Sequence, residues 1–384
     1  MLLVKNATIF TMKSGKVLEH SDILSHDGKI IQIGHDLTAD SAQVIDATGL
    51  YITPGLIDAH CHAGGGVTLS SDDVNEITDP ITPQLNVINS IDISDPYFRS
   101  LHKAGVTSCC IVPGSSNVIC GTGLVCKTAG KDSIYELVVL DPAVMKCALG
   151  RMPKRCYGKR GRAPVTRMGA AALLRDALRR AAEYMTQKAV ARVDESRRPV
   201  FDAKCEALIP VLKREIPLKV HCQQFDMLTV INISQEFGCD YTIEHGWCCG
   251  LYADELIAGG GMLSFGPIAI PEGYGELSGG DVFQLKSLYQ SDLNICLITD
   301  GPIYGPEALL FSAGEAVRSG LDHLQALAMI TCNPARGLRV DDRLGSLEIG
   351  KDADMVVFEG VPALDAGARV RYTIIDGRVV YSDK

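Results

Sequence analysis

The chain has no Cys-x-x-Cys pair, although 14 of its 384 residues are cysteines. A zinc site built from cysteine pairs is therefore not expected. Many of the cysteines lie inside apolar, strand-like runs, among them Cys109, Cys147 and Cys222. Cysteines in such positions are typical of buried free thiols in a reducing cytosol, and a chain of this length does not need disulfides to fold.

Long hydrophobic runs and an excess of positive charge are also missing. No stretch of about 18 apolar residues occurs, which argues against a transmembrane helix. The first ten residues, Met1–Phe10, lack the basic segment and long apolar stretch of a signal peptide and favour a β-strand. The formal net charge is −9, which disfavours nucleic acid or an anionic membrane as the main partner. We therefore expect a cytoplasmic protein that acts on a small molecule.

The two ends of the chain resemble each other and differ from the middle. Asp27-Gly28 separates two apolar alternating runs near the start, and Asp376-Gly377 does so near the end. An Asp-Gly pair between such runs is a strong signal for a β-hairpin. We therefore expect a small β-domain assembled from residues 1–53 and 348–384.

Residues 54–347 alternate between strand-like and helix-like runs, which predicts parallel strands connected by helices. About eight repeats favour a closed (β/α)8 barrel, an α/β fold, over an open sheet. The expected strands are Leu56–Ala59, Val106–Val112, one strand within Gly121–Leu140, Ala143–Leu149, Leu218–Cys222, Tyr241–Ile243, Met262–Phe265 and Asn294–Ile298. The expected helices include Gly169–Lys188, Ala203–Arg214, Leu228–Glu236, Asp281–Gln290 and Leu324–Cys332.

Several of the nine histidines follow these strand-like runs. His60 and His62 come after the first run, and their spacing of two aims both imidazoles at one point. His221, His245 and Asp300 end the fifth, sixth and eighth runs. Barrel enzymes build their sites at these C-terminal strand ends, so we interpret the five residues as one metal site. Nitrogen and oxygen ligands with an open position suit catalytic zinc, and similar sites take manganese, iron or nickel.

Two segments resemble the amidohydrolase superfamily. The first is Pro54-Gly-Leu-Ile-Asp-Ala-His-Cys-His62, which resembles its first-strand motif. The second comprises Thr331–Leu338 and Arg343–Val357, which resemble the passage from the last helix into a β-domain. The likeness spans the whole chain and is greatest to imidazolonepropionase-related and prolidase-like members. It implies a distorted TIM barrel with a β-sandwich formed from both termini.

The resemblance also implies roles for individual residues. His60 and His62 would bind the more buried metal ion, and His221 and His245 would bind a second one. Asp300 would be a ligand of the first ion and the proton shuttle. Lys146, in Ala143–Leu149, matches a lysine whose carboxylated form bridges two ions in binuclear members, and carboxylation would remove the cost of a lysine in an apolar strand. A lysine that reaches water at the strand edge is the alternative. Lys127 is a reserve candidate with an alternative structural role.

The substrate is expected to bind on the same face. Arg151 and Arg155 lie in a basic segment after the fourth strand and are candidates to hold a substrate carboxylate, although a solvated basic loop is an equal alternative. Gln223 is a candidate hydrogen-bonding residue, and Gln224 stands where deaminases carry a glutamate, which disfavours deamination. Tyr274 lies in a glycine-rich segment, Gly266–Gly280, which is expected to be a flap beside the substrate.

Together these features predict hydrolysis of an amide or cyclic amide by metal-activated hydroxide, with Asp300 as the proton shuttle. A carboxylate-bearing small molecule, such as a dipeptide or an N-acyl amino acid, is the expected substrate, and two zinc ions are the expected cofactor. An alternative is a ring-opening enzyme with one metal ion, like imidazolonepropionase. A catalytically silent oligomeric scaffold is a remote alternative, because such proteins usually lose metal ligands. Because oligomers are common among members of this superfamily, a homo-oligomer is also expected.

Overall fold

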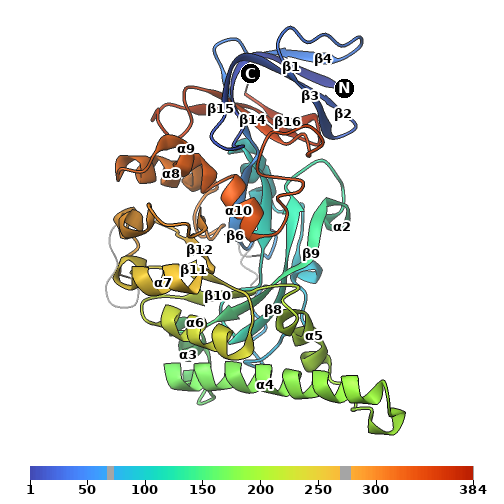
Figure 1. Cartoon of the computed structure of the whole chain (residues 1–384), viewed down its shortest axis with the longest axis vertical. Coiled ribbons are helices and arrows are strands. Elements are labelled where there is room, and N and C mark those ends of the chain that lie inside the picture. Colours follow the sequence, from blue (N-terminus) through green and yellow to red (C-terminus); the bar gives the residue numbers. More distant parts are fainter. Residues whose placement is uncertain (67–72, 269–277, 384) are drawn as a thin grey trace.

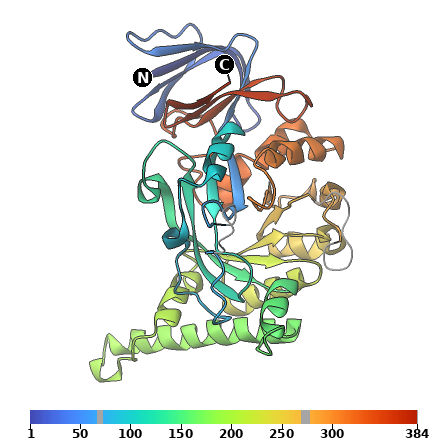
Figure 2. The same cartoon turned by 180° about the vertical axis from the view of Figure 1, so that it is seen from behind.

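The computed structural model of the chain describes residues 1–66, 73–268 and 278–383. Its strands form two eight-stranded sheets, one from the middle of the chain and one from its two ends. Figure 1 shows the sheet of the chain ends at the top, with both termini in it, and the other sheet below. Figure 2 shows from behind that the long helix in green lies at the end of the molecule farthest from the terminal sheet.

The middle of the chain forms a nearly closed barrel sheet with the strand order β13-β12-β11-β10-β9-β8-β7-β6. A parallel bridge between Cys61 and Gly301 joins the first strand to the segment after the last one. The strands are β6 (Leu56–Cys61), β7 (Val106–Ile111), β8 (Ile119–Lys127), β9 (Val138–Ala148), β10 (Leu218–Cys222), β11 (Tyr241–His245), β12 (Met262–Phe265) and β13 (Ile295–Leu297). The predicted α/β fold with an eight-stranded barrel sheet is confirmed.

One strand departs from the predicted parallel pairing. β8 is antiparallel to both β7 and β9, so the prediction of parallel strands throughout was wrong at this position. Residues 112–118 between β7 and β8 are too few for a parallel crossover, which needs about a dozen residues or more. The third strand also begins before the range Gly121–Leu140 in which it was expected.

Helices connect most of the other barrel strands. α4 is the longest, and the Thr166 side chain caps it by accepting a hydrogen bond from the backbone of Gly169. The α-helices are α1 (Pro96–Lys103), α2 (Ile134–Leu137), α3 (Arg151–Gly158), α4 (Arg167–Ala191), α5 (Ala203–Leu212), α6 (Asp226–Phe237), α7 (Ala253–Gly259), α8 (Ala308–Arg318), α9 (His323–Ala328) and α10 (Cys332–Gly337). The 3₁₀ helices are η2 (Val87–Ser90), η3 (Glu195–Arg197), η4 (Cys249–Tyr252) and η6 (Val282–Leu288), and η6 replaces the α-helix predicted at residues 281–290. Among the described residues, none of the helices has the length and apolar character needed to cross a membrane.

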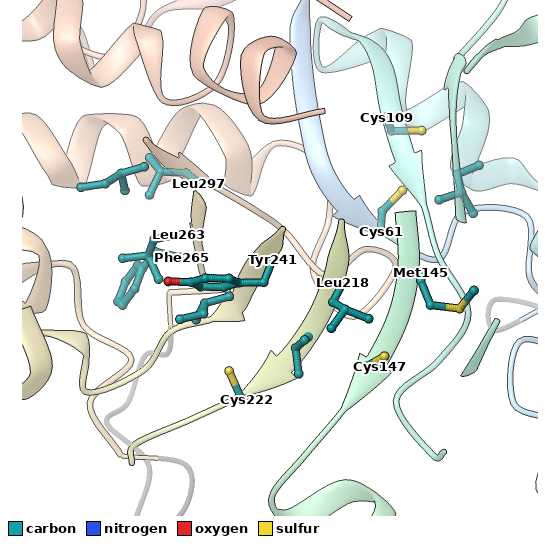
Figure 3. Close-up of a cluster of buried hydrophobic side chains, with 14 of the residues drawn as sticks. Cys61, Cys109, Met145, Cys147, Leu218, Cys222, Tyr241, Leu263, Phe265 and Leu297 are labelled. Atoms are coloured by element: carbon teal, nitrogen blue, oxygen red, sulfur yellow. The ribbon is translucent and has the colours of Figure 1, made fainter. Parts of the chain in front are cut away.

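Side chains on strands β9 to β12 alternate between an apolar face and a polar face, as the two-residue period of a strand requires. The apolar face belongs to the main hydrophobic core, in which Figure 3 shows Met145, Leu218, Tyr241, Leu263 and Phe265. Several intervening positions are buried and polar or charged, namely Lys146, Lys219, Thr242, Glu244 and Ser264. The barrel interior is therefore unusually rich in groups that need partners.

The cysteines lie largely within these packed regions. All 14 are free thiols, and Cys156, Cys248 and Cys332 are the three that are not buried. Figure 3 shows Cys61, Cys109, Cys147 and Cys222 among the apolar side chains of the barrel strands. The prediction of buried free thiols is confirmed, and their role is to fill apolar volume.

Strands from both ends of the chain form the terminal sheet. Its order is β16-β15-β14-β5-β1-β2-β3, with β4 paired to β1. The strands are β1 (Leu2–Phe10), β2 (Val17–His26), β3 (Lys29–Gly34), β4 (Gln43–Asp46), β5 (Tyr51–Pro54), β14 (Met355–Glu359), β15 (Arg369–Ile375) and β16 (Arg378–Ser382). The expected β-sandwich is thus one continuous hydrogen-bonded sheet with a core of its own. The boundaries 1–53, 54–347 and 348–384 stay our proposal for the domains.

Both predicted hairpins are present in this sheet. The φ angles are 47° at Asp27 and 78° at Gly28, and 49° at Asp376 and 68° at Gly377. Two consecutive positive φ angles are those of the tight turn that matches the twist of a two-stranded hairpin. The sequence signal therefore corresponds to a specific backbone conformation.

Lys127 joins the barrel to the terminal sheet. Its Nζ lies 2.9 Å from Asp352, 2.7 Å from Asp354 and 2.9 Å from Asp376, all of them near the strands of the C-terminal segment. Burial alone would lower the pKa of Lys127, but the three carboxylates raise it above its ordinary value. Lys127 therefore has the structural role that was its alternative to carboxylation.

Candidate metal centre

Three histidines and an aspartate converge where the barrel strands end. His60 and His62 lie at the end of β6, His245 ends β11, and Asp300 follows β13. An Oδ1 atom of Asp300 is 3.6 Å from His60 Nε2 and 3.2 Å from His62 Nε2. The ligand atoms of His60, His245 and Asp300 all lie within 4.8 Å of one another. These side chains therefore surround one point, as a bound cation requires.

His221 approaches the same group from β10. Its ring centroid is 4.3 Å from that of His245, and its Nδ1 is 3.1 Å from the hydroxyl of Ser115. The structure thus brings together all the histidines that the sequence suggested as ligands.

The Nδ1 atoms of the other three imidazoles have protein acceptors. His62 Nδ1 donates to the carbonyl of Val112 and His245 Nδ1 donates to the carbonyl of Gly266, each at 2.8 Å. His60 Nδ1 donates to Glu244 Oε2, also at 2.8 Å. Because a carbonyl or carboxylate oxygen needs a proton from its partner, these contacts place the proton on Nδ1. The Nε2 lone pairs are left for a metal ion.

The surroundings of one of these Nε2 atoms indicate whether an ion fits the site. His245 Nε2 is buried and has no hydrogen-bond partner among the described residues. An unsatisfied buried polar atom costs about 1–3 kcal/mol. A divalent cation between the imidazoles and Asp300 would satisfy it, so the donor set fits a metal ion.

Burial keeps the imidazoles in the form that binds metal. It lowers the pKa of His60 and His221 well below the ordinary value, and neighbouring positive groups, among them Lys146, lower it further. The pKa of His245 is also lowered, chiefly by burial. Burial alone would raise the pKa of Asp300, but His62, His245 and Lys146 beside its carboxylate bring it below its ordinary value. The site therefore presents neutral imidazoles and an ionised carboxylate.

Lys146 extends into this group from β9. Its side chain is fully buried, and its Nζ lies 3.0 Å from His60 Nε2. No ion pair joins Lys146 to a carboxylate within the described parts of the chain. Burial lowers the pKa of Lys146, which favours the neutral amine. The prediction that Lys146 lies beside the histidines agrees with this position, and the strand-edge alternative is wrong because the side chain does not reach water.

The backbone at His245 explains how two adjacent residues both face the barrel interior. Neighbours on a regular strand point to opposite faces, yet Glu244 contacts His60 while the ring of His245 lies 5.2 Å from that of His60. His245 has a φ angle of 72°, in the left-handed region that side chains seldom adopt. This local turn redirects His245 toward the candidate ligands.

Sequence reasoning missed several buried residues beside the ligands. Glu244 and Lys219 form an ion pair of 2.8 Å, and both are fully buried. Asp58 accepts a hydrogen bond from Thr299, and burial raises the pKa of Asp58 to about 6. The signal for Lys219 and Glu244 was a charged residue within an apolar strand, the same signal that singled out Lys146.

The candidate substrate residues that the structure describes follow β9 and β10, and the two arginines have fewer polar contacts than the candidate ligands. Arg151 is half-buried at the start of α3, Arg155 is exposed one turn later, and Gln223 is buried just after β10. Neither arginine has an ion pair or a hydrogen bond to a described residue. Tyr274 and most of the expected flap lie outside the described residues.

Other cations near α3 do have partners. Arg167 contacts Asp226 at 3.0 Å and lies over the ring of Phe225, and Arg162 lies over the ring of Tyr157. The basic segment is therefore not uniformly solvated, and Arg151 and Arg155 are among its cations that have no partner in the described residues.

Comparison with known proteins gives the same family that the motifs suggested. Residues 220–380 match the Amidohydrolase family. Amidohydrolase tasK of Hapsidospora irregularis is 30% identical over 395 residues, which cover 94% of this chain. The chain spans only 40% of the length of that protein.

Solved structures resemble the whole chain. An amidohydrolase from Thermotoga maritima MSB8 is 35% identical, with a TM-score of 0.94 and coverage of 100% of both chains. A prolidase solved with N-methylphosphonate-L-proline has a TM-score of 0.59 over 100% of both chains, and at 16% identity it shows the shared fold alone. Full-length agreement with the Thermotoga maritima protein, together with the match over residues 220–380, shows that the chain belongs to the amidohydrolase family.

Proposed function

We propose that the protein is a metal-dependent hydrolase that cleaves the carbon–nitrogen bond of an amide or cyclic amide. The observation that carries this proposal is the buried Nε2 of His245, which has no partner among the described residues and lies beside His60 and Asp300. Membership of the amidohydrolase family supports the same chemistry. When bound, a divalent cation would lower the pKa of a water molecule and polarise the scissile carbonyl.

Two zinc ions are the proposed cofactor, held by His60, His62, His221, His245, Asp300 and a carboxylated Lys146. Imidazole and carboxylate ligands suit zinc, and manganese, iron or nickel could occupy the same ligands. Carboxylation would join Lys146 Nζ to the carbon of carbon dioxide with the loss of one proton. The burial of Lys146 without a carboxylate partner supports this step, because the carbamate turns an isolated buried amine into an anionic ligand.

Asp300 is the proposed proton shuttle. Its carboxylate would accept a proton from the attacking water and then deliver it to the leaving nitrogen as the carbon–nitrogen bond breaks. The pKa of Asp300 lies below its ordinary value because of His62, His245 and Lys146 beside it, which favours the ionised form that can accept a proton.

The proposed substrate is a small molecule with a carboxylate, such as a dipeptide or an N-acyl amino acid. Arg151 and Arg155 supply cations on the helix that directly follows β9. Both lie on the same face of this helix, because residues four apart on a helix are neighbours. Their lack of a described partner supports a role in binding an added carboxylate.

A first experiment would measure metal per chain by plasma mass spectrometry, on protein produced with zinc and bicarbonate and purified without chelator. The same preparation would be tested for hydrolysis of dipeptides, N-acyl amino acids and cyclic amides. A ratio near two with hydrolysis of an acid supports the proposal. A ratio near one would favour the ring-opening alternative with a single ion, and a metal-free protein would contradict both.

A further inference from the structure

Glu244 is a fully buried carboxylate with donors on both oxygens. Its Oε2 lies 2.8 Å from His60 Nδ1 and 2.8 Å from Lys219 Nζ. Its Oε1 accepts hydrogen bonds from the hydroxyl of Thr242 at 2.5 Å and from that of Ser264 at 3.2 Å. Three hydrogen-bond donors and the ammonium group of Lys219 thus surround one carboxylate. So complete a set of partners fixes the position of Glu244 inside the barrel.

Lys219 provides the charge that this arrangement needs. It is fully buried on β10, and its Cα is the register partner of Thr242 on the neighbouring strand. A carboxylate in a dry interior is costly unless a cation and hydrogen bonds surround it. The ion pair with Lys219 therefore permits a negative charge to stand directly behind a candidate metal ligand.

His60 differs from the other candidate ligands in what holds its Nδ1. The Nδ1 atoms of His62 and His245 contact neutral backbone carbonyls, and that of His221 contacts the hydroxyl of Ser115. Within the described residues, His60 is the candidate ligand whose Nδ1 contacts a carboxylate. An anionic acceptor orients the ring and increases the basicity of the opposite nitrogen. His60 Nε2 is the atom that faces Lys146 and Asp300.

We propose that Glu244 is a positioning residue that fixes the ring orientation and the tautomer of His60, and that Lys219 balances its buried charge. This inference rests on the proposed metal-dependent function and concerns how one ligand is prepared for the ion. The proton sits on Nδ1, between His60 and Glu244, so that the Nε2 lone pair points toward the ion.

Two matched double variants test this role. Glu244→Gln with Lys219→Met keeps an oxygen acceptor for His60 Nδ1, whereas Glu244→Met with Lys219→Met removes the acceptor at nearly the same side-chain volume. Both variants lack the buried cation, so neither leaves Lys219 without a partner. The readout is the zinc dissociation constant, measured by competition with a chelator. Circular dichroism of the metal-free proteins provides the comparison of folding and thermal stability.

We expect the methionine variant to bind zinc roughly 10–100-fold more weakly than the glutamine variant, at similar stability of the metal-free forms. If the methionine variant does not fold, Glu244→Asp gives a second comparison, because it keeps a charge for Lys219 but withdraws the oxygen from His60. Its zinc affinity should then be weaker than that of the wild type.

Equal zinc affinities in the two double variants, or wild-type affinity in Glu244→Asp, would overturn the positioning role alone. Failure of the wild-type protein to bind zinc or another divalent ion would instead overturn the proposed function, and this inference with it. The two failures are therefore distinguished by the wild-type measurement.

Discussion

Lys146 and Lys219 are register partners on β9 and β10, and both side chains are fully buried. The Nζ of Lys219 lies 2.8 Å from a carboxylate oxygen of Glu244, whereas the Nζ of Lys146 lies 3.0 Å from His60 Nε2. Two lysines in one layer of the barrel thus have different surroundings. One is balanced by an anion, and the other faces the candidate ligands.

This difference leads to a prediction for Lys146. We expect Lys146→Met to reduce the metal content by about one ion per chain, because a binuclear site of this kind needs the bridging carbamate. Wild-type protein prepared with ¹³C-bicarbonate should show a carbamate carbon signal by NMR that is missing from the variant. Unchanged metal content together with an unchanged spectrum would contradict carboxylation at Lys146.

Asp300→Asn should slow turnover of any hydrolysed substrate by about 10²–10⁴-fold, the usual contribution of a positioned acid–base group. The amide retains an oxygen that can contact a cation but cannot carry the proton. Plasma mass spectrometry on the same preparation checks that metal is retained. Wild-type turnover in a variant that holds metal would disprove the shuttle role.

Arg151→Gln combined with Arg155→Gln should raise KM for acidic substrates by roughly tenfold, in line with the loss of a charge-assisted hydrogen bond. KM for the matching uncharged amides should change little. Arg160→Gln is the matched control, because Arg160 lies just after the same helix and donates to the carbonyl of Cys156. An equal rise for acids and amides would show that the two arginines do not bind a carboxylate.

Lys127→Met should lower the free energy of unfolding by about 3–5 kcal/mol, because it removes the cation shared by the buried carboxylates of Asp352 and Asp354. Urea denaturation at neutral pH measures this change. Lys13→Met is a suitable control, since Lys13 is exposed and its ion pair with Glu348 is worth at most about 1 kcal/mol. Equal losses in the two variants would argue against a role for Lys127 in joining the barrel to the terminal sheet.

The same cluster predicts a dependence of stability on acid pH. Burial alone would raise the pKa of Asp352, but Lys127, Lys29 and Arg343 lower it to about 2. A folded pKa below the unfolded value of about 3.9 stabilises the fold above that value, and the stabilisation is lost as the pH falls toward 2. The difference in unfolding free energy between the wild type and Asp352→Asn should therefore shrink from pH 4 to pH 2. A constant difference across this range would contradict the assignment.

Much of the fold could be predicted from local patterns. Asp27-Gly28 and Asp376-Gly377 marked the hairpins because these residues adopt the positive φ angles that the turns require. The direction of β8 was not predicted, because the start of this strand was not located within Gly121–Leu140 and the connection before it, residues 112–118, was not recognised as too short for a parallel crossover.

The candidate site could also be predicted only in part from the sequence. His60, His62 and Asp300 could be located because each follows an apolar run at the end of a strand. Glu244 is a charged residue within an apolar strand, but its contact with the ligands could not be predicted, since a regular strand would turn it away from the face that His245 occupies. The positive φ angle at His245 redirects this side chain to the face of Glu244, and no residue type in that segment predicts such a backbone conformation.

The contact between Cys61 and Gly301 has a consequence for how the site forms. The backbone N–H of His62 donates to the carbonyl of Gly301 at 2.6 Å, so the first and last strands of the barrel meet beside the candidate ligands. His60 and His62 lie on one side of this seam and Asp300 on the other. The ligands therefore come together only when the barrel is closed. An ion bound by residues on both sides of this contact would stabilise the closed barrel.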